Sequence, residues 1–221
     1  MDMKEVIKHR RMTRKFSSQP IAKNLDKHIA EMALRSPTAG NCRAIDILLL
    51  NDERSLKQFW EVSTTVDVSL SPGLRLIQNA PVVMLPLYNI DKYLNRYSLD
   101  DKKNSRLYRL DPDSWDVPFW ITDASFAAMT ILLSAENYGL GALFFQLHRP
   151  QQEVLGSFMI PDHIKTIGAI ALGYKAFTAE KDTTGNRNKL PDGKNEIFPG
   201  AGNASGHEDN LKNSHIHVNV W

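Results

Sequence analysis

Three arginines near the start of the chain form its densest positive charge and could hold an anion. Arg10, Arg11 and Arg14 lie within a basic run that ends at Phe16. Their planar guanidinium groups suit the paired oxygens of a phosphate. If the first predicted helix continues through them, Arg10 and Arg14 share one face. A basic helix end that complements the helix dipole is one alternative, and a nucleic-acid contact, which a single short cluster supports weakly, is another.

A loop of small residues, Pro37-Thr38-Ala39-Gly40-Asn41, could bind the edge of a planar polar ligand. It offers backbone N–H groups, one hydroxyl and one carboxamide with little bulk. An ordinary tight turn would also have this composition. The neighbouring Cys42 is the only cysteine, and a lone cysteine beside a strand is typical of a small buried residue.

Two glycines flank Leu140 after a long apolar stretch, 121–138, that predicts a central helix. Thr122 and Asp123 resemble a helix cap, Gly139 resembles a helix stop, and Gly141 precedes a short strand. Glycines at this spacing let the backbone approach something flat. The stretch is not a dinucleotide-binding fingerprint, because the third glycine is missing and a helix precedes it. A helix this apolar must be buried in the domain centre or in a subunit interface.

Composition narrows the class of protein. The chain has 221 residues, 42% hydrophobic and 9% aromatic, with a net charge of +2. These values favour a folded domain and give no general argument for nucleic acid or a membrane. One cysteine excludes an intrachain disulfide, and only His215 and His217 lie close enough to suggest a metal, with no further ligand, so no metal site is expected. No signal peptide or membrane span is recognisable, and we expect a cytoplasmic protein.

The remaining pattern predicts one α+β domain over residues 1–175 and an extended tail over 176–221. Helices are predicted at 3–9, 23–35, 52–62, 74–79 and 151–158, and strands at 45–50, 81–87, 142–147 and 166–174. Residues 89–120 are polar, aromatic and irregular, which is typical of a lid over a site. The last residues alternate with period two, which predicts a strand at 216–220 whose valines and isoleucine are buried.

In order and spacing, five motifs resemble the nitroreductase family of flavin enzymes. They are Arg10-Arg11-Met12-Thr13-Arg14-Lys15-Phe16, Ser36-Pro37-Thr38-Ala39-Gly40-Asn41, Ala80-Pro81, Tyr138-Gly139-Leu140-Gly141-Ala142, and Ile160-Pro161-Asp162 with Ala171-Leu172-Gly173-Tyr174. The match covers residues 4–175. The Arg-Arg-Met opening and the aromatic residues at 115–120 look closest to an actinobacterial-type branch. Met12 stands where many relatives have serine.

The resemblance implies a nitroreductase-like fold: a central, mostly antiparallel sheet flanked by helices, in an intertwined homodimer whose C-terminal strand is exchanged. It implies FMN at the subunit interface and NAD(P)H as electron donor. The cofactor-binding residues would be Arg10, Arg11, Met12, Arg14, Pro37, Thr38, Ala39, Asn41, Leu140, Gly141, Ala142 and Arg187, with Lys189 as the alternative to Arg187. Trp115, Phe119 and Trp120 would contact substrate.

The implied activity is oxidoreduction by a ping-pong flavin mechanism, with no side-chain acid or base required. Electrons would pass from NAD(P)H to a small planar acceptor, nitroaromatic or quinone-like. The alternatives are a non-catalytic protein that sequesters FMN, and a different flavin reaction on the same scaffold, such as dehalogenation or enoate reduction.

Overall fold

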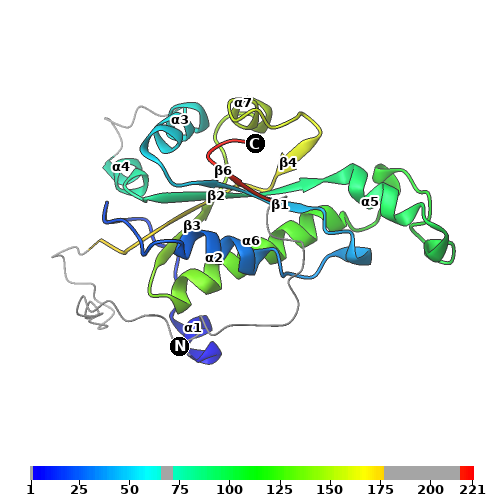
Figure 1. The fold of residues 1–221 in the computed structure, drawn as a ribbon, viewed down its shortest axis with the longest axis horizontal. Helices are drawn as coiled ribbons and strands as arrows, with labels where there is room; N and C mark the ends of the chain where they lie inside the picture. The colour runs from blue at the N-terminus through cyan, green and yellow to red at the C-terminus, as the bar shows by residue number, and fades with distance from the viewer. Residues whose placement is uncertain (1, 66–71, 177–214) are drawn as a thin grey trace.

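A mixed six-stranded sheet forms the middle layer of the molecule (Figure 1). The structure, a computed structural model, describes residues 2–65, 72–176 and 215–221. The strand order is β3-β5-β2-β1-β6, with β4 also paired to β2, and every pairing except the parallel β1–β6 pair is antiparallel. The strands are β1 (Ile45–Leu50), β2 (Val82–Asn89), β3 (Gly141–Phe145), β4 (Ile164–Thr166), β5 (Ala169–Gly173) and β6 (Ile216–Val218). The predicted α+β class with a mostly antiparallel sheet is confirmed.

Helices cover both faces of this sheet. Helices α2 (Leu25–Ala33) and α6 (Phe119–Asn137) pack on one face, with α1 (Met3–His9) beside α6; α3 (Glu53–Ser63) and α7 (Gln151–Gly156) pack on the other (Figure 1). Helix α4 (Pro72–Gln78) precedes β2, and α5 (Ile90–Tyr97) follows it. The side chains of β1 alternate between the two cores, since Ile47 and Leu49 join the α2–α6 cluster while Leu48 and Leu50 join the α3–α7 cluster. Among the described residues, no helix is long and apolar enough to cross a bilayer.

Helix α6 begins and ends for identifiable reasons. It starts at Phe119, directly after Pro118, and not at the predicted Thr122–Asp123 cap. Asp123 is inside the helix and only 2% exposed, because its carboxylate binds groups on other elements. The predicted stop is confirmed: Gly139 has φ +73°, and the N–H of Leu140 reaches back to the carbonyl of Ala135.

The predicted irregular segment 89–120 is more ordered than its composition indicates. It contains α5, whose first turn is capped by Asn89, and two short 3₁₀ turns. Four of its aromatic side chains are buried in the α2–α6 core: Tyr93, Tyr97, Trp115 and Trp120. The sequence pattern did not indicate that these residues are buried, because they stand among polar residues. Tyrosine and tryptophan carry a polar atom at the ring edge, and their ring faces can still pack in a core.

The predicted strand 166–174 is two strands, β4 and β5. The break falls at Gly168, which has φ +142° and no room for a Cβ, since one would lie 2.6 Å from the carbonyl oxygen of Phe145. Both strands still pair with β2, so the sheet turns a corner there without losing its connection.

The C-terminal strand is shorter than predicted, and its predicted apolar face is covered only in part. β6 lies parallel to β1 of the same chain; Ile216 packs against the α2–α6 core, whereas Val218 and Val220 are exposed. His217 instead faces the α3–α7 core, where its ring stacks on Trp221 with centroids 3.9 Å apart. The backbone N–H of Trp221 donates to the carbonyl of Phe158, which fixes the end of the chain.

A buried carboxylate in β1 accounts for the inward position of His215 and His217. Asp46 accepts a 2.6 Å hydrogen bond from His215 Nδ1, and Lys92 Nζ lies 3.5 Å from its other oxygen. His217 Nε2 is 3.7 Å from Asp46 and is buried without a hydrogen-bond partner among the described residues. The two histidines therefore turn towards the acid, and the valines turn out.

We predict that this cluster makes stability depend on pH. Burial lowers the pKa of His217, and its neighbours His215 and Lys92 lower it further, while Asp46 opposes the shift. The unfolded chain then binds a proton more readily than the folded one, so stability is lost as pH falls below about 6.5. His217→Phe keeps the stack on Trp221 without a titrating group. Its unfolding midpoint in urea should fall less between about pH 7 and pH 5 than that of the unaltered protein; equal slopes would contradict the assignment.

Candidate functional site

The arginine segment, residues 10–16, lies beside the start of β3, the strand that follows the glycine turn at 139–141. α1 ends at His9, and residue Arg10 leaves the helix with φ −52° and ψ 125°, so the helix does not continue through the arginines as considered from the sequence. Met12 forms a parallel bridge with Ala142, and the N–H of Thr13 donates to the Ala142 carbonyl at 2.9 Å. Two of the sequence motifs, residues 10–16 and 138–142, are thus brought together by backbone pairing.

The three arginines have different surroundings. Arg10 Nη1 is buried and has no hydrogen-bond partner among the described residues. Arg11 is exposed, and its Nη1 donates to the carbonyls of Lys8 and Arg10, which caps the end of α1 as the helix-end alternative expected. Arg14 is exposed. A buried guanidinium N–H without an acceptor is costly, so Arg10 is the arginine that best fits an anionic group.

The small-residue loop has a strained backbone that several partners hold. Ala39–Asn41 forms one 3₁₀ turn, in which Gly40 and Asn41 have positive φ, as does Arg43 just after it. Arg96 of α5 donates from Nε to the Gly40 carbonyl at 2.7 Å and also forms a two-pronged ion pair with Asp101. Non-glycine residues at positive φ persist only where surrounding contacts fix them.

A buried network that sequence reasoning did not identify joins this loop to α5 and α6. Asp123 Oδ2 accepts two hydrogen bonds of 2.8 Å, one from the Ala39 N–H and one from the Tyr93 hydroxyl. Cys42 lies beside Tyr93, close enough for each side chain to influence the pKa of the other. Burial raises the pKa of Asp123, although its two donors oppose the shift. Burial also raises the pKa of the Cys42 thiol, which is therefore a poor nucleophile at neutral pH.

The loop and the glycine turn lie at opposite ends of α6. Asp123 holds the loop near the start of the helix, and Gly139 follows its last residue, Asn137. Fourteen residues of helix separate Asp123 from Asn137, which places the two features about 21 Å apart along the axis. One chain therefore does not bring all the predicted site residues together.

The predicted substrate residues lie close to one another. Trp115 is in ring contact with Phe119 and Trp120, at centroid distances of 6.1 and 5.4 Å. The two tryptophans are 6% and 7% exposed, and Phe119 is partly buried. Trp115 Nε1 is buried and has no partner among the described residues. Arg187 and Lys189 lie outside the described residues.

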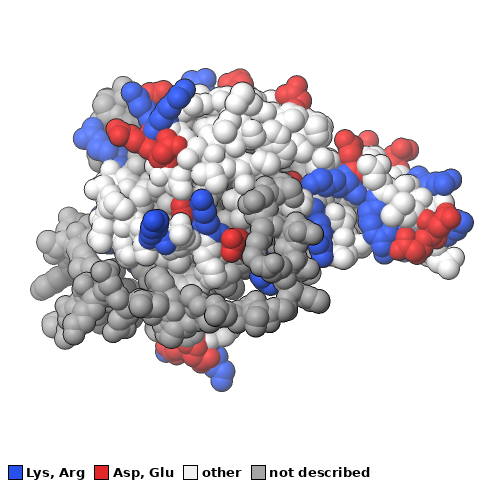
Figure 2. Space-filling model, in the orientation of Figure 1, with Lys and Arg blue, Asp and Glu red and all other residues white. Residues whose placement is uncertain are grey.

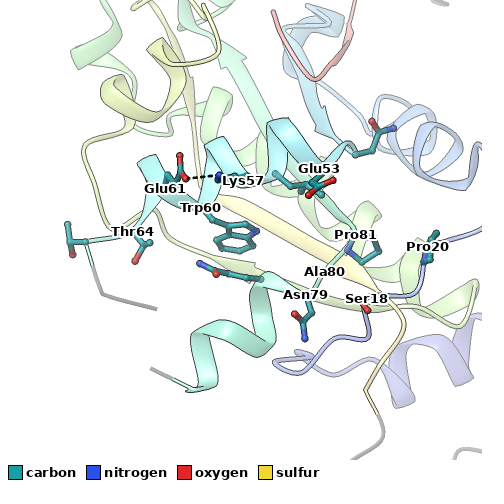
Figure 3. A pocket seen from close by; sticks show the side chains of 14 residues that line it. Ser18, Pro20, Glu53, Lys57, Trp60, Glu61, Thr64, Asn79, Ala80 and Pro81 are labelled. Carbon is teal, nitrogen blue, oxygen red and sulfur yellow. Dashed lines mark ion pairs between the residues drawn. The ribbon is translucent and has the colours of Figure 1, made fainter. Parts of the chain in front are cut away.

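A separate pocket of about 1220 Å³ opens between α3, α4 and the loop 18–20, and none of the predicted site residues lines it (Figure 3). Trp60 lies over its centre, and Lys57 and Glu61 on its rim are 4.0 Å apart. The pocket adjoins Thr65, the last described residue before 66–71. It is on the sheet face that α3 and α7 cover, opposite the face that α6 covers.

Basic and acidic side chains are interspersed around α5 on the face that Figure 2 shows. Figure 2 shows lysine and arginine mixed with acidic side chains over α5 and the residues after it, where Arg96–Asp101 and Lys103–Asp100 pair. Within the part of the chain that the structure describes, no group of three or more His, Cys, Asp and Glu residues could hold a metal ion.

Comparison with known proteins identifies the family. The model of the nitroreductase family matches residues 7–174, so the chain belongs to the nitroreductase family. A Methanothermobacter thermautotrophicus protein provisionally named NADH dehydrogenase/NAD(P)H nitroreductase is 27% identical over 180 residues, 80% of this chain and 78% of its own. A Thermus thermophilus protein named NADH dehydrogenase is 23% identical over 191 residues, 80% and 88% of the two chains.

Solved structures share the fold. A nitroreductase family protein from Clostridium novyi NT superposes with a TM-score of 0.64 at 16% identity, over 100% of this chain and 95% of its own. A Desulfovibrio desulfuricans structure determined in complex with FMN has a TM-score of 0.59 at 15% identity, over 80% and 88% of the two chains. The nitroreductase-like α+β fold of the single chain, expected from the five motifs, is thereby confirmed.

We predict that Gly141 keeps the arginine segment in place. A Cβ at position 141 would lie 2.5 Å from Thr13 Oγ1, whereas one at Gly139 meets nothing within 4 Å and is strained only by φ. Gly141→Ala should therefore cost about 1–3 kcal/mol of stability through overpacking, and trypsin should cleave faster within residues 10–15. Gly139→Ala is the control: it should cost about 1–2 kcal/mol without exposing that segment. Equal trypsin rates in the two variants would show that Thr13 yields without moving the arginines.

Proposed function

We propose that this protein is an FMN-dependent oxidoreductase that takes electrons from NAD(P)H. The observation that carries the proposal is the buried Nη1 of Arg10, which has no hydrogen-bond partner within residues 2–65, 72–176 and 215–221. It lies on a segment that is hydrogen-bonded to the strand after the glycine turn, so a phosphate at Arg10 and a flat ring near Gly141 could belong to one ligand. Family membership, the NAD(P)H-linked names of relatives and the FMN complex of a structural neighbour support it.

The flavin, when bound, supplies hydride and electron transfer, and the chain's residues position it. Arg10 and Arg14 would hold the phosphate, with Arg187 as a further candidate. Met12 and the backbone of Leu140, Gly141 and Ala142 would border the ring. Pro37, Thr38, Ala39 and Asn41 would contact the same cofactor from the partner subunit. Arg11 would contribute little, because its guanidinium already binds the end of α1.

We further propose a small planar acceptor, nitroaromatic or quinone-like. Trp115 carries an indole N–H for which the described part of the chain offers no acceptor, and nitro or carbonyl oxygens are hydrogen-bond acceptors. Phe119 and Trp120 would pack against the flat face of such a substrate. The Arg10-Arg11-Met12 opening is the basis for placing the chain in the actinobacterial-type branch.

A homodimer would complete each site. Ile121, Phe126 and Met129 of α6 are 42%, 45% and 48% exposed, although the rest of this helix is largely buried. Phe126 and Met129 also line a groove that reaches Pro37. If two α6 helices pack antiparallel about a two-fold axis, the apolar face is covered and the loop of one chain meets the glycine turn of the other. This arrangement overcomes the separation of about 21 Å within one chain.

The first prediction from this proposal concerns cofactor binding. The purified protein should be yellow or take up FMN at about one per chain, because Arg10 offers a charge-assisted donor. Without oxygen, NAD(P)H should bleach the flavin, and a quinone or nitroaromatic should restore the colour. Arg10→Ala should weaken FMN binding by about 1.5–3 kcal/mol, whereas Arg149→Ala, a surface arginine paired with Glu153, should not.

Three results would argue against this assignment. A colourless protein that calorimetry shows not to bind FMN would overturn the whole proposal. Bound FMN that NAD(P)H cannot reduce would favour the sequestering alternative. Unchanged FMN affinity in Arg10→Ala would remove the phosphate role from this side chain.

The second prediction concerns the C-terminal strand, which we propose to be exchanged between subunits, with residues 176–221 wrapping the partner. The β1 edge that β6 covers would pair with the partner's strand in the same register. Asn51 and Asn219 are hydrogen-bonded side by side at this junction. In a Cys42→Ser background, Asn51→Cys with Asn219→Cys should form a disulfide that links two chains, seen as a dimer band under non-reducing denaturing conditions.

The control for this test is Asn219→Cys alone in the same background, which should give no specific band. A disulfide that forms but leaves the chains separate would show that each β6 stays on its own β1. Exchange would then be excluded, while the dimer through α6 would be judged separately by its sedimentation.

A further inference from the structure

One buried carboxylate holds the start of the small-residue loop and the tyrosine behind it. The Ala39 N–H at the start of the 3₁₀ turn donates directly to Asp123 Oδ2. Tyr93, a neighbour of Cys42 at the end of the turn, donates its hydroxyl to the same oxygen. Asp123 therefore fixes both the backbone of the turn and the side chain against its last residue.

The surroundings of Asp123 indicate that the carboxylate serves this loop. It is 2% exposed in the middle of the α2–α6 core, and no ion pair involves it among the described residues. The other buried acid of α6, Glu136, is paired with Lys175 at 3.1 Å. A buried carboxylate without a cation is costly for folding, so stability does not explain it. Its hydrogen bonds are spent on fixing a loop whose backbone has positive φ at Gly40, Asn41 and Arg43.

We propose that Asp123 is a positioning residue, which sets the height and angle of the 37–42 loop for the cofactor; this rests on the proposed flavin function. Tyr93, which donates to Asp123, lies beside Cys42 at the end of the turn. Arg96 holds the loop from α5 by donating to the Gly40 carbonyl. The segment 89–120 thus supports the loop through two side chains of α5, Tyr93 and Arg96. Asp123 itself touches no reacting atom.

The protein contains its own probe of this arrangement. Cys42 is the only cysteine in the chain, so the rate of its modification by Ellman's reagent reports on this loop alone. Asp123→Ala removes the acceptor of the Ala39 N–H and of the Tyr93 hydroxyl and should raise that rate about tenfold or more. Asp123→Asn keeps an oxygen acceptor without the charge and should stay within about twofold of the unaltered protein. Glu136→Gln is the matched control, because it alters a buried acid of the same helix that pairs with Lys175 and not with the loop.

Flavin affinity separates positioning from packing. FMN should bind about tenfold or more weakly to Asp123→Ala, and Asp123→Asn should restore it. Added FMN should also slow Cys42 modification in the unaltered protein. If the thiol rates change as expected while FMN affinity is equal in all variants, the loop is held but not for the cofactor, and the proposal is overturned.

The remaining outcomes are also decisive. An unchanged thiol rate in Asp123→Ala overturns the proposal, as does an equal acceleration in Glu136→Gln, which would reflect general loosening. If Asp123→Ala does not fold, Tyr93→Phe replaces it, since this change removes only the hydroxyl; Cys42 must then react faster, or the proposal fails. A protein that takes up no FMN refutes the proposed function, and in that case Cys42 rates that follow the expected order still establish the loop clamp.

Discussion

The need to cover α6 on nearly every side governs this structure. Nineteen residues of helix carry apolar side chains around most of their circumference, and the sheet, α2 and α1 cover most of them. A helix buried in this way has no water to satisfy polar groups, so those it keeps must find partners in neighbouring elements. Asp123 binds the 37–42 loop, Thr130 binds Ser36, and Glu136 binds Lys175. These three polar side chains thereby attach other segments of the chain to the helix.

The same constraint explains why the proposed site is divided. The loop is attached near the start of α6 and the glycine turn follows its end, so the helix length sets their separation. The side left uncovered carries Ile121, Phe126 and Met129, which a second copy would bury. Dimerisation through α6, as proposed, would therefore both cover the helix and complete the site. The segment 89–120 also has a structural role. Its aromatic rings Tyr93, Tyr97, Trp115 and Trp120 belong to the core, while the Tyr93 hydroxyl and the Arg96 guanidinium help to fix the 37–42 loop.

Much of this could be predicted where one physical requirement dominates a stretch of sequence. The run Ile45–Leu50, apolar except for Asp46, is typical of a buried strand, and Gly139 adopts the positive φ that ends a helix. Position and partners are harder to predict. Asp123 was expected to cap a helix. A carboxylate that caps a helix and one that is buried inside it can have the same neighbours in the sequence, and only the tertiary contacts distinguish them. Alternation at 215–220 indicates a strand but not its inward face, which a distant acid, Asp46, decides. The pairing of residues 10–14 with β3 is likewise a long-range contact that no local pattern contains, although the family motifs place both segments at one site.

The docking of Trp221 has a practical consequence for anyone who handles this protein. The last residue of the chain is seated against the α3–α7 core, stacked on His217 and tied to Phe158 through its backbone. A purification tag or fluorescent fusion added there would continue from the main chain of a residue whose ring and N–H are both held in place. It would therefore strain the short strand before it. Asp2, at the other end, is exposed and precedes a helix that has only Val6 buried. Fusion partners therefore belong at the N-terminus, where a linker can leave without disturbing the fold.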